Sequence, residues 1–176
     1  MNLTVEPEAP DPAWPRYGKS PFPPYRFVPG RSPHPRRNPK GHAYGTTEPK
    51  PPPPDPEKWR ENDLYLHGID LYNFAYWWEC HEALEALWHA AGHKSPTGQF
   101  LQGIIQVAAA NLKKFSGLEG TPLKLAKEGL ARHAGLSSPY MGVDLEAFAR
   151  DAVAWHEGRT ERPALIRLGM QDAQRS

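Results

Sequence analysis

The amino-acid sequence predicts an all-α fold: a bundle of about five helices with an extended, proline-rich N-terminal arm packed on its surface. Seventeen of the 21 prolines lie before residue 57 of the 176-residue chain. Because proline lacks the amide donor and restrains the residue before it, such a density is incompatible with helices and central strands. After residue 57, apolar residues recur at spacings of three and four, and no useful stretch alternates with a period of two.

Helix boundaries are predicted by residues that favour helix starts and stops. Asp55-Pro56 has the pattern of an N-cap followed by a first-turn proline. The expected helices begin at Asp55-Pro56, cover 76–91 and 97–115, start again at Thr121-Pro122, and run from the cap Asp144 to Gly158. Short connections between them are typical of a bundle.

Three parts are expected along the chain: the irregular arm at 1–55, the helical bundle at 56–170 and a disordered tail at 171–176. Aromatic residues are interleaved through the arm, whereas disordered segments are usually poor in them. Residues 20–45 are therefore expected to lie along the bundle with their aromatic rings in surface grooves. The apolar residues of 161–170 predict that this segment packs back on the bundle.

The composition argues against a secreted or membrane protein. The single cysteine, Cys80, cannot form an internal disulfide, so an oxidising compartment is not required. The first residues lack the basic and apolar regions of a signal peptide. The longest charge-free stretch, Ser95–Leu112, contains four amide side chains, which a bilayer span rarely holds. We therefore expect a cytoplasmic protein that does not insert in a membrane.

The segment 76–88, YWWECHEALEALW, carries the candidate catalytic residues. On a helical wheel, His81 and Glu85 lie one turn apart at the edge of the apolar face that contains Leu84. A carboxylate beside a histidine orients the ring and stabilises its protonated form, so the pair could act as a general acid and base. His81, Glu85 and the neighbouring Glu82 are the candidate catalytic residues.

The charge-free third helix could complete a pocket. It is apolar nearly all round except for a stripe containing Gln102 and Gln106, a pattern typical of a central helix. A buried amide without a partner costs about 1–3 kcal/mol, and the nearest expected partners are His81 and Glu85. We therefore expect a small-molecule pocket between the second and third helices, with hydrolysis as one possible reaction. The candidate ligand-binding residues are Trp77, Trp78, Trp88, Gln102, Gln106, and the arm residues His34 and His42 as caps.

His81 can be interpreted in three ways: as a structural residue held by Glu85, as an acid–base or ligand-binding group, or as a metal ligand. The sequence HEALE differs from the zinc-protease pattern HExxH by Glu85 at its last position. A carboxylate can bind zinc, so a metal stays an option, although spacing fixes no third ligand. His89 and His93 are also four residues apart, but His93 follows Gly92 at the predicted helix end. The tryptophans have a simple alternative role, packing in the core.

Two motifs resemble one known family. LYNFAYWWECHEALEALW (71–88) and FLQGIIQVAAANLKK (100–114) resemble domain of unknown function 309, with its His-Glu-x-x-Glu-x-x-Trp and Gln-Gly-x-x-Gln motifs. The resemblance spans roughly residues 60–135, and the proline-rich leader at 28–45 is similar to that of some members. One departure is Ala75, where a glycine is usual. The resemblance implies an all-helical bundle and supplies no reaction.

Two functions without catalysis remain as alternatives. Between Asp11 and Glu48 every charged residue is positive, so the arm could bind a nucleic acid or a partner protein. The charge-free third helix could instead complete its burial against a second copy and form a homodimer. The positive residues of the arm are Arg16, Lys19, Arg26, Arg31, Arg36, Arg37 and Lys40.

Overall fold

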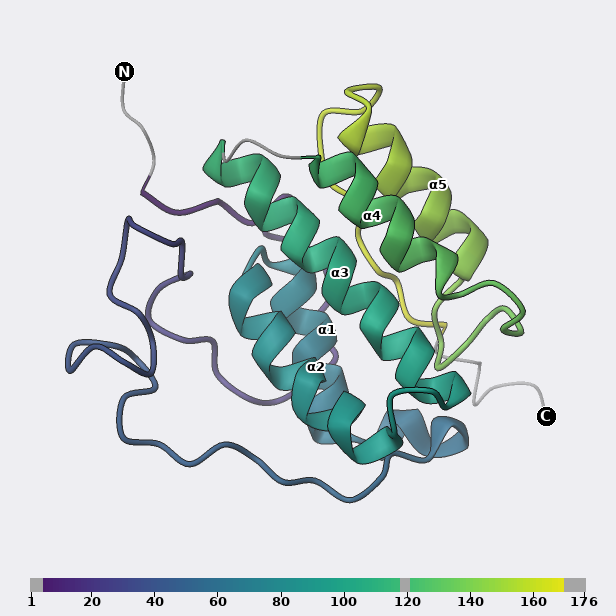
Figure 1. Cartoon of the computed structure of the whole chain (residues 1–176), viewed down its shortest axis with the longest axis horizontal. Helices are drawn as coiled ribbons and strands as arrows, with labels where there is room; N and C mark the ends of the chain where they lie inside the picture. Colours follow the sequence, from purple (N-terminus) through teal and green to yellow (C-terminus); the bar gives the residue numbers. More distant parts are fainter. Residues whose placement is uncertain (1–4, 118–120, 170–176) are drawn as a thin grey trace.

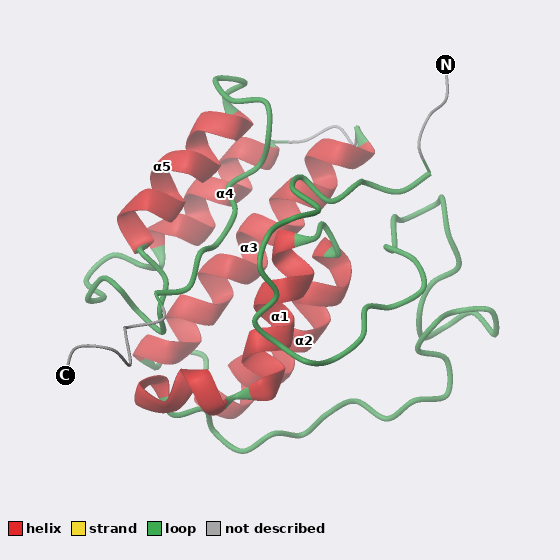
Figure 2. Cartoon of the chain, turned by 180° about the vertical axis from the view of Figure 1, so that it is seen from behind, coloured by secondary structure: helices red, strands yellow, loops and turns green. Residues whose placement is uncertain are grey.

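A computed structural model describes residues 5–117 and 121–169, so the expected tail at 171–176 lies outside the described residues. In chain order the elements are the 3₁₀ helix η1 (Pro56–Glu61) and the α-helices α1 (Asp63–Asn73), α2 (Trp77–Ala91), α3 (Pro96–Ser116), α4 (Pro122–Ala131) and α5 (Leu145–His156). Within the described ranges no residue belongs to a strand, and the helices pack as a bundle (Figures 1 and 2). The predicted all-α bundle is confirmed.

Three of the predicted helix starts carry the expected side-chain caps, whereas Thr121, at the predicted start of α4, makes no side-chain cap hydrogen bond. The Asp55 side chain accepts a hydrogen bond from the backbone N–H of Glu57 at the start of η1. Ser95 caps α3 in the same way, and Asp144 caps α5. Each cap satisfies one of the amides that a helix start leaves without an internal partner.

The first predicted helix is interrupted. Asn62 has extended backbone angles, and its side chain accepts from the N–H of Tyr65, so a new helix begins immediately after η1. Tyr76, expected as the first residue of the helix 76–91, is the N-cap that precedes α2. The connection between α1 and α2 passes through Ala75 at a φ of 65°, in the left-handed region that favours glycine. The departure noted in the family motif therefore falls on a strained residue.

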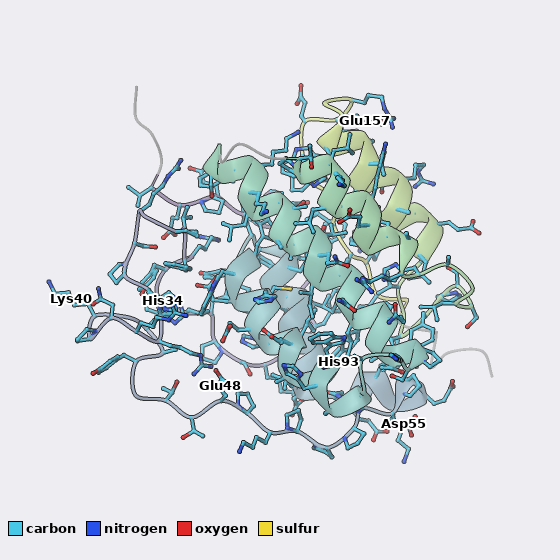
Figure 3. The ribbon with its side chains drawn as sticks, viewed as in Figure 1. His34, Lys40, Glu48, Asp55, His93 and Glu157 are labelled. Atoms are coloured by element: carbon cyan, nitrogen blue, oxygen red, sulfur yellow. The ribbon has the colours of Figure 1, made fainter. Side chains whose placement is uncertain are left out.

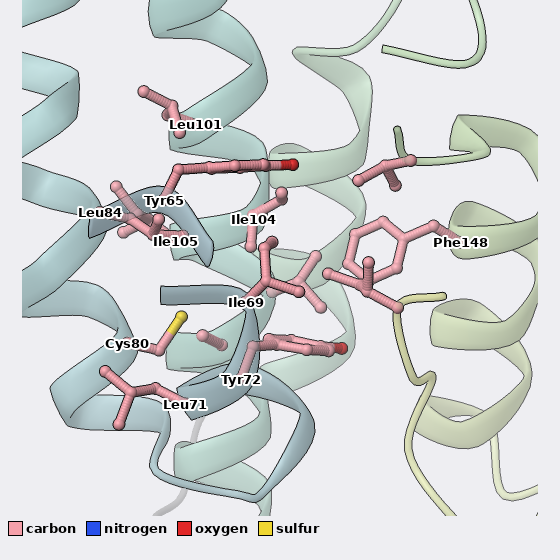
Figure 4. Close-up of a cluster of buried hydrophobic side chains, with 14 of the residues drawn as sticks. Tyr65, Ile69, Leu71, Tyr72, Cys80, Leu84, Leu101, Ile104, Ile105 and Phe148 are labelled. Carbon is pink, nitrogen blue, oxygen red and sulfur yellow. The ribbon is translucent and has the colours of Figure 1, made fainter. Parts of the chain in front are cut away.

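The core lies between α1, α2, α3 and α5. Tyr65, Ile69 and Tyr72 project from α1 toward Ile104 of α3 and Phe148 of α5 (Figure 4). The hydroxyl of Tyr65 donates to the carbonyl of Met141, and that of Tyr72 donates to the carbonyl of Ala164. Burial raises the pKa of both hydroxyls, which keeps them protonated as donors.

The third predicted helix, α3, lies between α2 and α4 in the middle of the bundle (Figure 1). Most of its apolar residues are buried by helices of the same chain, and in the described ranges the exposed large hydrophobic residues are Val5 and Tyr44. A homodimer through α3 stays a prediction. It would require part of this surface to be uncovered, because other helices of the same chain pack against it. In the described ranges, none of the helices combines the length and apolarity needed to cross a bilayer.

The arm lies against the bundle, as predicted, because buried acids of the helices bind it. Asp70 of α1 is completely buried and accepts from Arg16 Nε at 3.0 Å, from the N–H of Tyr17 at 2.7 Å and from the N–H of Gly18 at 2.9 Å. Farther along the arm, Phe27 and Val28 are buried.

The segment after α5 also packs back on the bundle. The side chain of Asn73, in the last turn of α1, donates to the carbonyl of Ile166 at 2.8 Å and accepts from its N–H at 2.7 Å. The indole N–H of Trp14, in the arm, donates to the same carbonyl. The arm and the C-terminal segment therefore meet against α1, which confirms the expectation for the described part of 161–170.

Candidate functional site

The helix α2 positions the candidate catalytic residues. Cys80, Leu84 and Leu87 are completely buried and fix one face of this helix against the core, as the wheel predicted. His81 and Glu85 lie beside that face and are about one-third exposed. The orientation of the site therefore follows from the apolar spacing of α2.

Glu85 lies between two histidines of the same helix. Its Oε2 is 3.4 Å from His81 Nε2, and its Oε1 is 3.5 Å from His89 Nε2. Both distances suit an ion pair with a protonated imidazole. The structure therefore brings His81 and Glu85 together as predicted, and adds His89 on the other side of the carboxylate.

A hollow of about 260 Å³ opens beside His81. Its lining residues are Pro29, Trp77, Trp78, His81, Ala109, Leu112 and Lys113. Two indoles from α2, apolar side chains from α3 and one proline from the arm thus form walls around a single imidazole, with an exposed lysine among the lining residues. This combination of apolar walls and few polar groups is typical of small-molecule sites.

Glu82 faces a different, more polar groove of about 520 Å³ between α2 and the arm around residues 48–51. Its Oε2 is 3.0 Å from Arg36 Nε, and the same nitrogen is 3.6 Å from Glu48 Oε1. Glu48, which lines this groove, is labelled in Figure 3. Glu82, predicted as catalytic, is thus paired with an arginine of the arm.

Three side chains could hold a metal ion. One ligand atom from each of His81, Glu82 and Glu85 lies within 4.8 Å of the others. An imidazole with two carboxylates suits zinc or manganese. Because Arg36 Nε lies 3.0 Å from Oε2 of Glu82, the guanidinium would compete with the ion for this carboxylate.

The expected pairing of Gln106 with His81 and Glu85 is wrong. Gln106 accepts from Nε of Arg132, the residue that ends α4. A Cβ on Gly129 of α4 would lie 2.7 Å from the Cβ of Gln106, so this part of α3 faces α4. Gln102 lies one turn earlier on the same stripe and is half-buried. Because α3 has a helix on each side, its periodicity could not show which neighbour its polar stripe would meet.

The three candidate tryptophans have separate environments. Trp77 and Trp78 line the hollow beside His81. Trp88 was expected in the same pocket, but this prediction is wrong, because Trp88 is not among the residues that line the hollow. Its ring instead stacks on that of His93, with centroids 3.7 Å apart. Two of the three tryptophans of α2, Trp77 and Trp78, therefore form walls of the hollow.

The two candidate histidines of the arm contact α2 outside the His81–Glu85 pair. His42 Nε2 is 2.9 Å from Oε1 of Glu79, and both side chains are buried. The prediction that His42 caps His81 and Glu85 is therefore wrong. The ring of His34 lies 5.4 Å from that of Trp78, edge-on, and so supports a wall of the hollow from outside.

Glu79 is a buried site residue that the sequence analysis missed. It accepts from the N–H of Phe27 at 2.9 Å as well as meeting His42. On the wheel it lies opposite the apolar face of α2, where solvent is expected. The arm, which helical periodicity does not represent, covers this side. The apolar pair Phe27-Val28 in the arm is the sequence signal that could have found it, because an apolar segment of the arm needs a helix surface to cover.

Comparison with known proteins adds a family and no reaction. Residues 65–118 match the family model described as Domain of unknown function (DUF309). No curated protein and no solved structure matches the chain. The matched segment contains nearly all of α1, with α2 and α3, and hence His81, Glu82, Glu85 and both tryptophans of the hollow. Over residues 65–118, this chain is therefore similar to the family described as Domain of unknown function (DUF309).

Proposed function

We propose that the protein binds a small organic molecule in the hollow beside His81 and hydrolyses it with His81 as the proton-transfer group. The observation that carries this proposal is that one imidazole both lines the hollow and lies 3.4 Å from the carboxylate of Glu85. Glu85 orients the ring, so that His81 can take a proton from water and return it to a leaving group.

The walls suggest the class of ligand. The volume of about 260 Å³ is at the small end for ligand pockets, and suits a molecule of about one ring. Trp77 and Trp78 favour an apolar or aromatic body. Lys113 favours an anionic group or an ester carbonyl at the polar side. We therefore expect small aromatic acids to bind and their esters to react.

A purely structural role for the His81–Glu85 pair has weaker support. Both side chains are about one-third exposed. Exposed ion pairs between neighbouring helix turns stabilise a fold by about 0.3–0.5 kcal/mol, so stability alone gives little reason for this arrangement.

Hydrolysis of methyl benzoate, the ester of a one-ring aromatic acid, by the full chain and by paired variants tests the proposal. His81→Gln should lower the rate by about 100-fold or more, because general acid–base catalysis contributes at least this factor. His89→Gln is the matched control: His89 also contacts Glu85 but does not line the hollow. Equal rates for the two variants would assign the hydrolysis to ordinary surface histidines and refute the catalytic part of the proposal.

Binding is tested separately by titrating benzoate while tryptophan fluorescence is recorded. Lys113→Gln should weaken binding of the carboxylate of benzoate. Leu112→Ala, as a separate variant, should weaken binding of its ring, because Leu112 lines the hollow. A saturable signal that neither variant changes would place the ligand outside the hollow.

A second candidate function is metal-dependent binding at His81, Glu82 and Glu85, which the 4.8 Å grouping of their ligand atoms favours. Elemental analysis and native mass spectrometry of the purified chain would report a retained ion. Arg36→Gln should raise the zinc affinity, since the guanidinium competes for Glu82. If Arg36→Gln and Glu82→Gln both bind zinc as the natural chain does, Glu82 is no ligand.

Binding of a nucleic acid or a partner protein by the basic arm has less support. Arg16, Arg26 and Arg36 are paired with acids of the same chain. The exposed cations Lys19, Arg37 and Lys40 would provide the phosphate contacts. A mobility shift that disappears when these three are replaced by glutamine, and weakens steeply with salt, would support this alternative.

A further inference from the structure

A pair of histidines at the C-terminal end of α2, His89 and His93, lies outside the hollow beside His81. His89 Nδ1 is 2.9 Å from His93 Nε2, and both rings are exposed. His93 follows the helix, but Gly92 at a φ of 85° turns the chain so that the ring of His93 returns to the helix (Figure 3). There it stacks on Trp88 with the two ring planes only 9° apart.

We propose that His89 and His93 chelate a divalent transition-metal ion, with copper(II) and nickel(II) as the best-fitting ions. Imidazole nitrogens bind such ions at about 2.0–2.1 Å, and two nitrogens in neighbouring corners of a square plane are then about 2.9 Å apart. This is the distance between the two nitrogens here. Tetrahedral zinc would require a wider separation of about 3.4 Å.

Two neighbouring contacts prepare His89 and His93 for an ion. Glu85 Oε1 attracts the other ring nitrogen of His89, Nε2, at 3.5 Å. A carboxylate beside the second nitrogen is the usual support of a metal-binding histidine, because it leaves the first nitrogen unprotonated. His93 is held by the Trp88 stack and by the Gln99 side chain, which donates to its carbonyl at 2.7 Å.

A direct N–H···N hydrogen bond between two neutral rings gives the same distance, and chelation requires two further adjustments. The ring that donates this hydrogen bond releases the proton to water and takes one up at its other nitrogen, so that both facing nitrogens have a lone pair. The exposed ring of His89 also rotates until its lone pair and that of His93 converge on one point. Water molecules complete the square plane, so the ion is exchangeable. The order of divalent affinities favours copper(II) over nickel(II) and zinc(II).

Titration of the full, untagged chain with copper(II) at pH 7.5 tests the chelate. Bound copper should quench tryptophan fluorescence, because Trp88 is in contact with a ligand ring. Loss of a mere supporting contact weakens metal sites about 10–100-fold, so His89→Gln and His93→Gln should each weaken copper binding about tenfold or more. Electron paramagnetic resonance of the natural chain should show two imidazole nitrogens on copper.

The control variant is His81→Gln, which lacks the other histidine beside Glu85 and should bind copper normally. The proposal is overturned if His89→Gln and His93→Gln bind copper as the natural chain does. It is equally overturned if His81→Gln loses the same affinity, because the ion would then belong to the His81–Glu82–Glu85 group. Circular dichroism of each variant confirms its fold, which substitutions at these exposed positions should not disturb.

Discussion

Asp70 is a single residue whose charge fixes a distant segment. Its carboxylate is completely buried and accepts three hydrogen bonds from the arm, one of them from a guanidinium. Asp70→Asn places an amide N–H₂ among these donors, and should lower the free energy of unfolding by about 2–3 kcal/mol. Urea denaturation would measure the loss. Asp151→Asn is the control, because its exposed carboxylate pairs only with Arg150 next to it and should matter by less than about 1 kcal/mol.

His156 makes stability depend on pH. Burial, and then the nearby Lys114, lower the pKa of this imidazole from its ordinary 6.5 to about 4. Between pH 6.5 and about pH 4, the imidazole of His156 is protonated in the unfolded chain and stays neutral in the folded chain. The contribution to stability is thus complete above pH 6.5 and is lost as the pH falls toward about 4.

The measurement for His156 is urea unfolding at pH 7.5 and pH 5. His156→Gln should reduce the difference in unfolding free energy between the two, whereas the exposed control His93→Gln should leave it unchanged. A difference as large in His156→Gln as in the natural chain would show that other groups carry the acid sensitivity. His133 is one such group, since burial also lowers its pKa.

Single residues were predictable where one helix decides their surroundings. His81 and Glu85 are one turn apart on α2, so their contact follows from helix geometry alone. Gln106 and Glu79 were not predictable in the same way, because their partners, Arg132 and His42, come from other segments. Helical spacing defines which residues share a face and says nothing about which segment covers that face.

The close contact of α3 with α4 depends on two glycines. A Cβ on Gly103 would lie 2.2 Å from His133 Nε2 and 2.8 Å from the carbonyl oxygen of Gly129. Gly103→Ala gains about 1 kcal/mol of helix propensity. It also forces the two helices apart and displaces His133 from its hydrogen bond to the carbonyl of Phe100, which together cost about 2–4 kcal/mol.

Gly103→Ala should therefore be destabilised by about 1–3 kcal/mol in thermal or urea unfolding. Gln102→Ala, one residue earlier on α3 and half-buried, is the control and should change stability by no more than about 0.5 kcal/mol. An alanine at 103 that stabilises the protein would mean that α3 and α4 have room to separate.

At the level of elements, the starts of helices were the most predictable feature, because a cap acts within three residues of its own position. Ser95 and Asp144 show this directly. The break at Asn62 was missed, since apolar spacing continues across it while one side chain begins a new helix. Ala75 marks the tightest turn, where a φ of 65° stores strain that spacing does not reveal.

The arm and the bundle, predicted as separate parts, are connected through buried contacts. Asp70 and Glu79 are helix residues whose partners lie in the arm. One wall of the hollow beside His81 is Pro29, also from the arm. A chain without its arm would therefore lose both stability and part of the candidate site.

Deletion of residues 1–50 tests this dependence for the whole molecule. The arm buries Phe27 and Val28, worth about 1.5–3 kcal/mol each, and leaves Asp70 and Glu79 without donors when it is removed. The sum of about 5–12 kcal/mol is comparable with the whole stability of an ordinary domain, about 5–15 kcal/mol. The truncated chain should therefore show little cooperative melting by circular dichroism, and a peptide of residues 5–50 should restore it.

The full-length control Arg37→Ala with Lys40→Ala, both exposed arm residues, should melt like the natural chain. A truncated chain with an unchanged melting temperature would mean that the helices are stable alone and that the arm only rests on them.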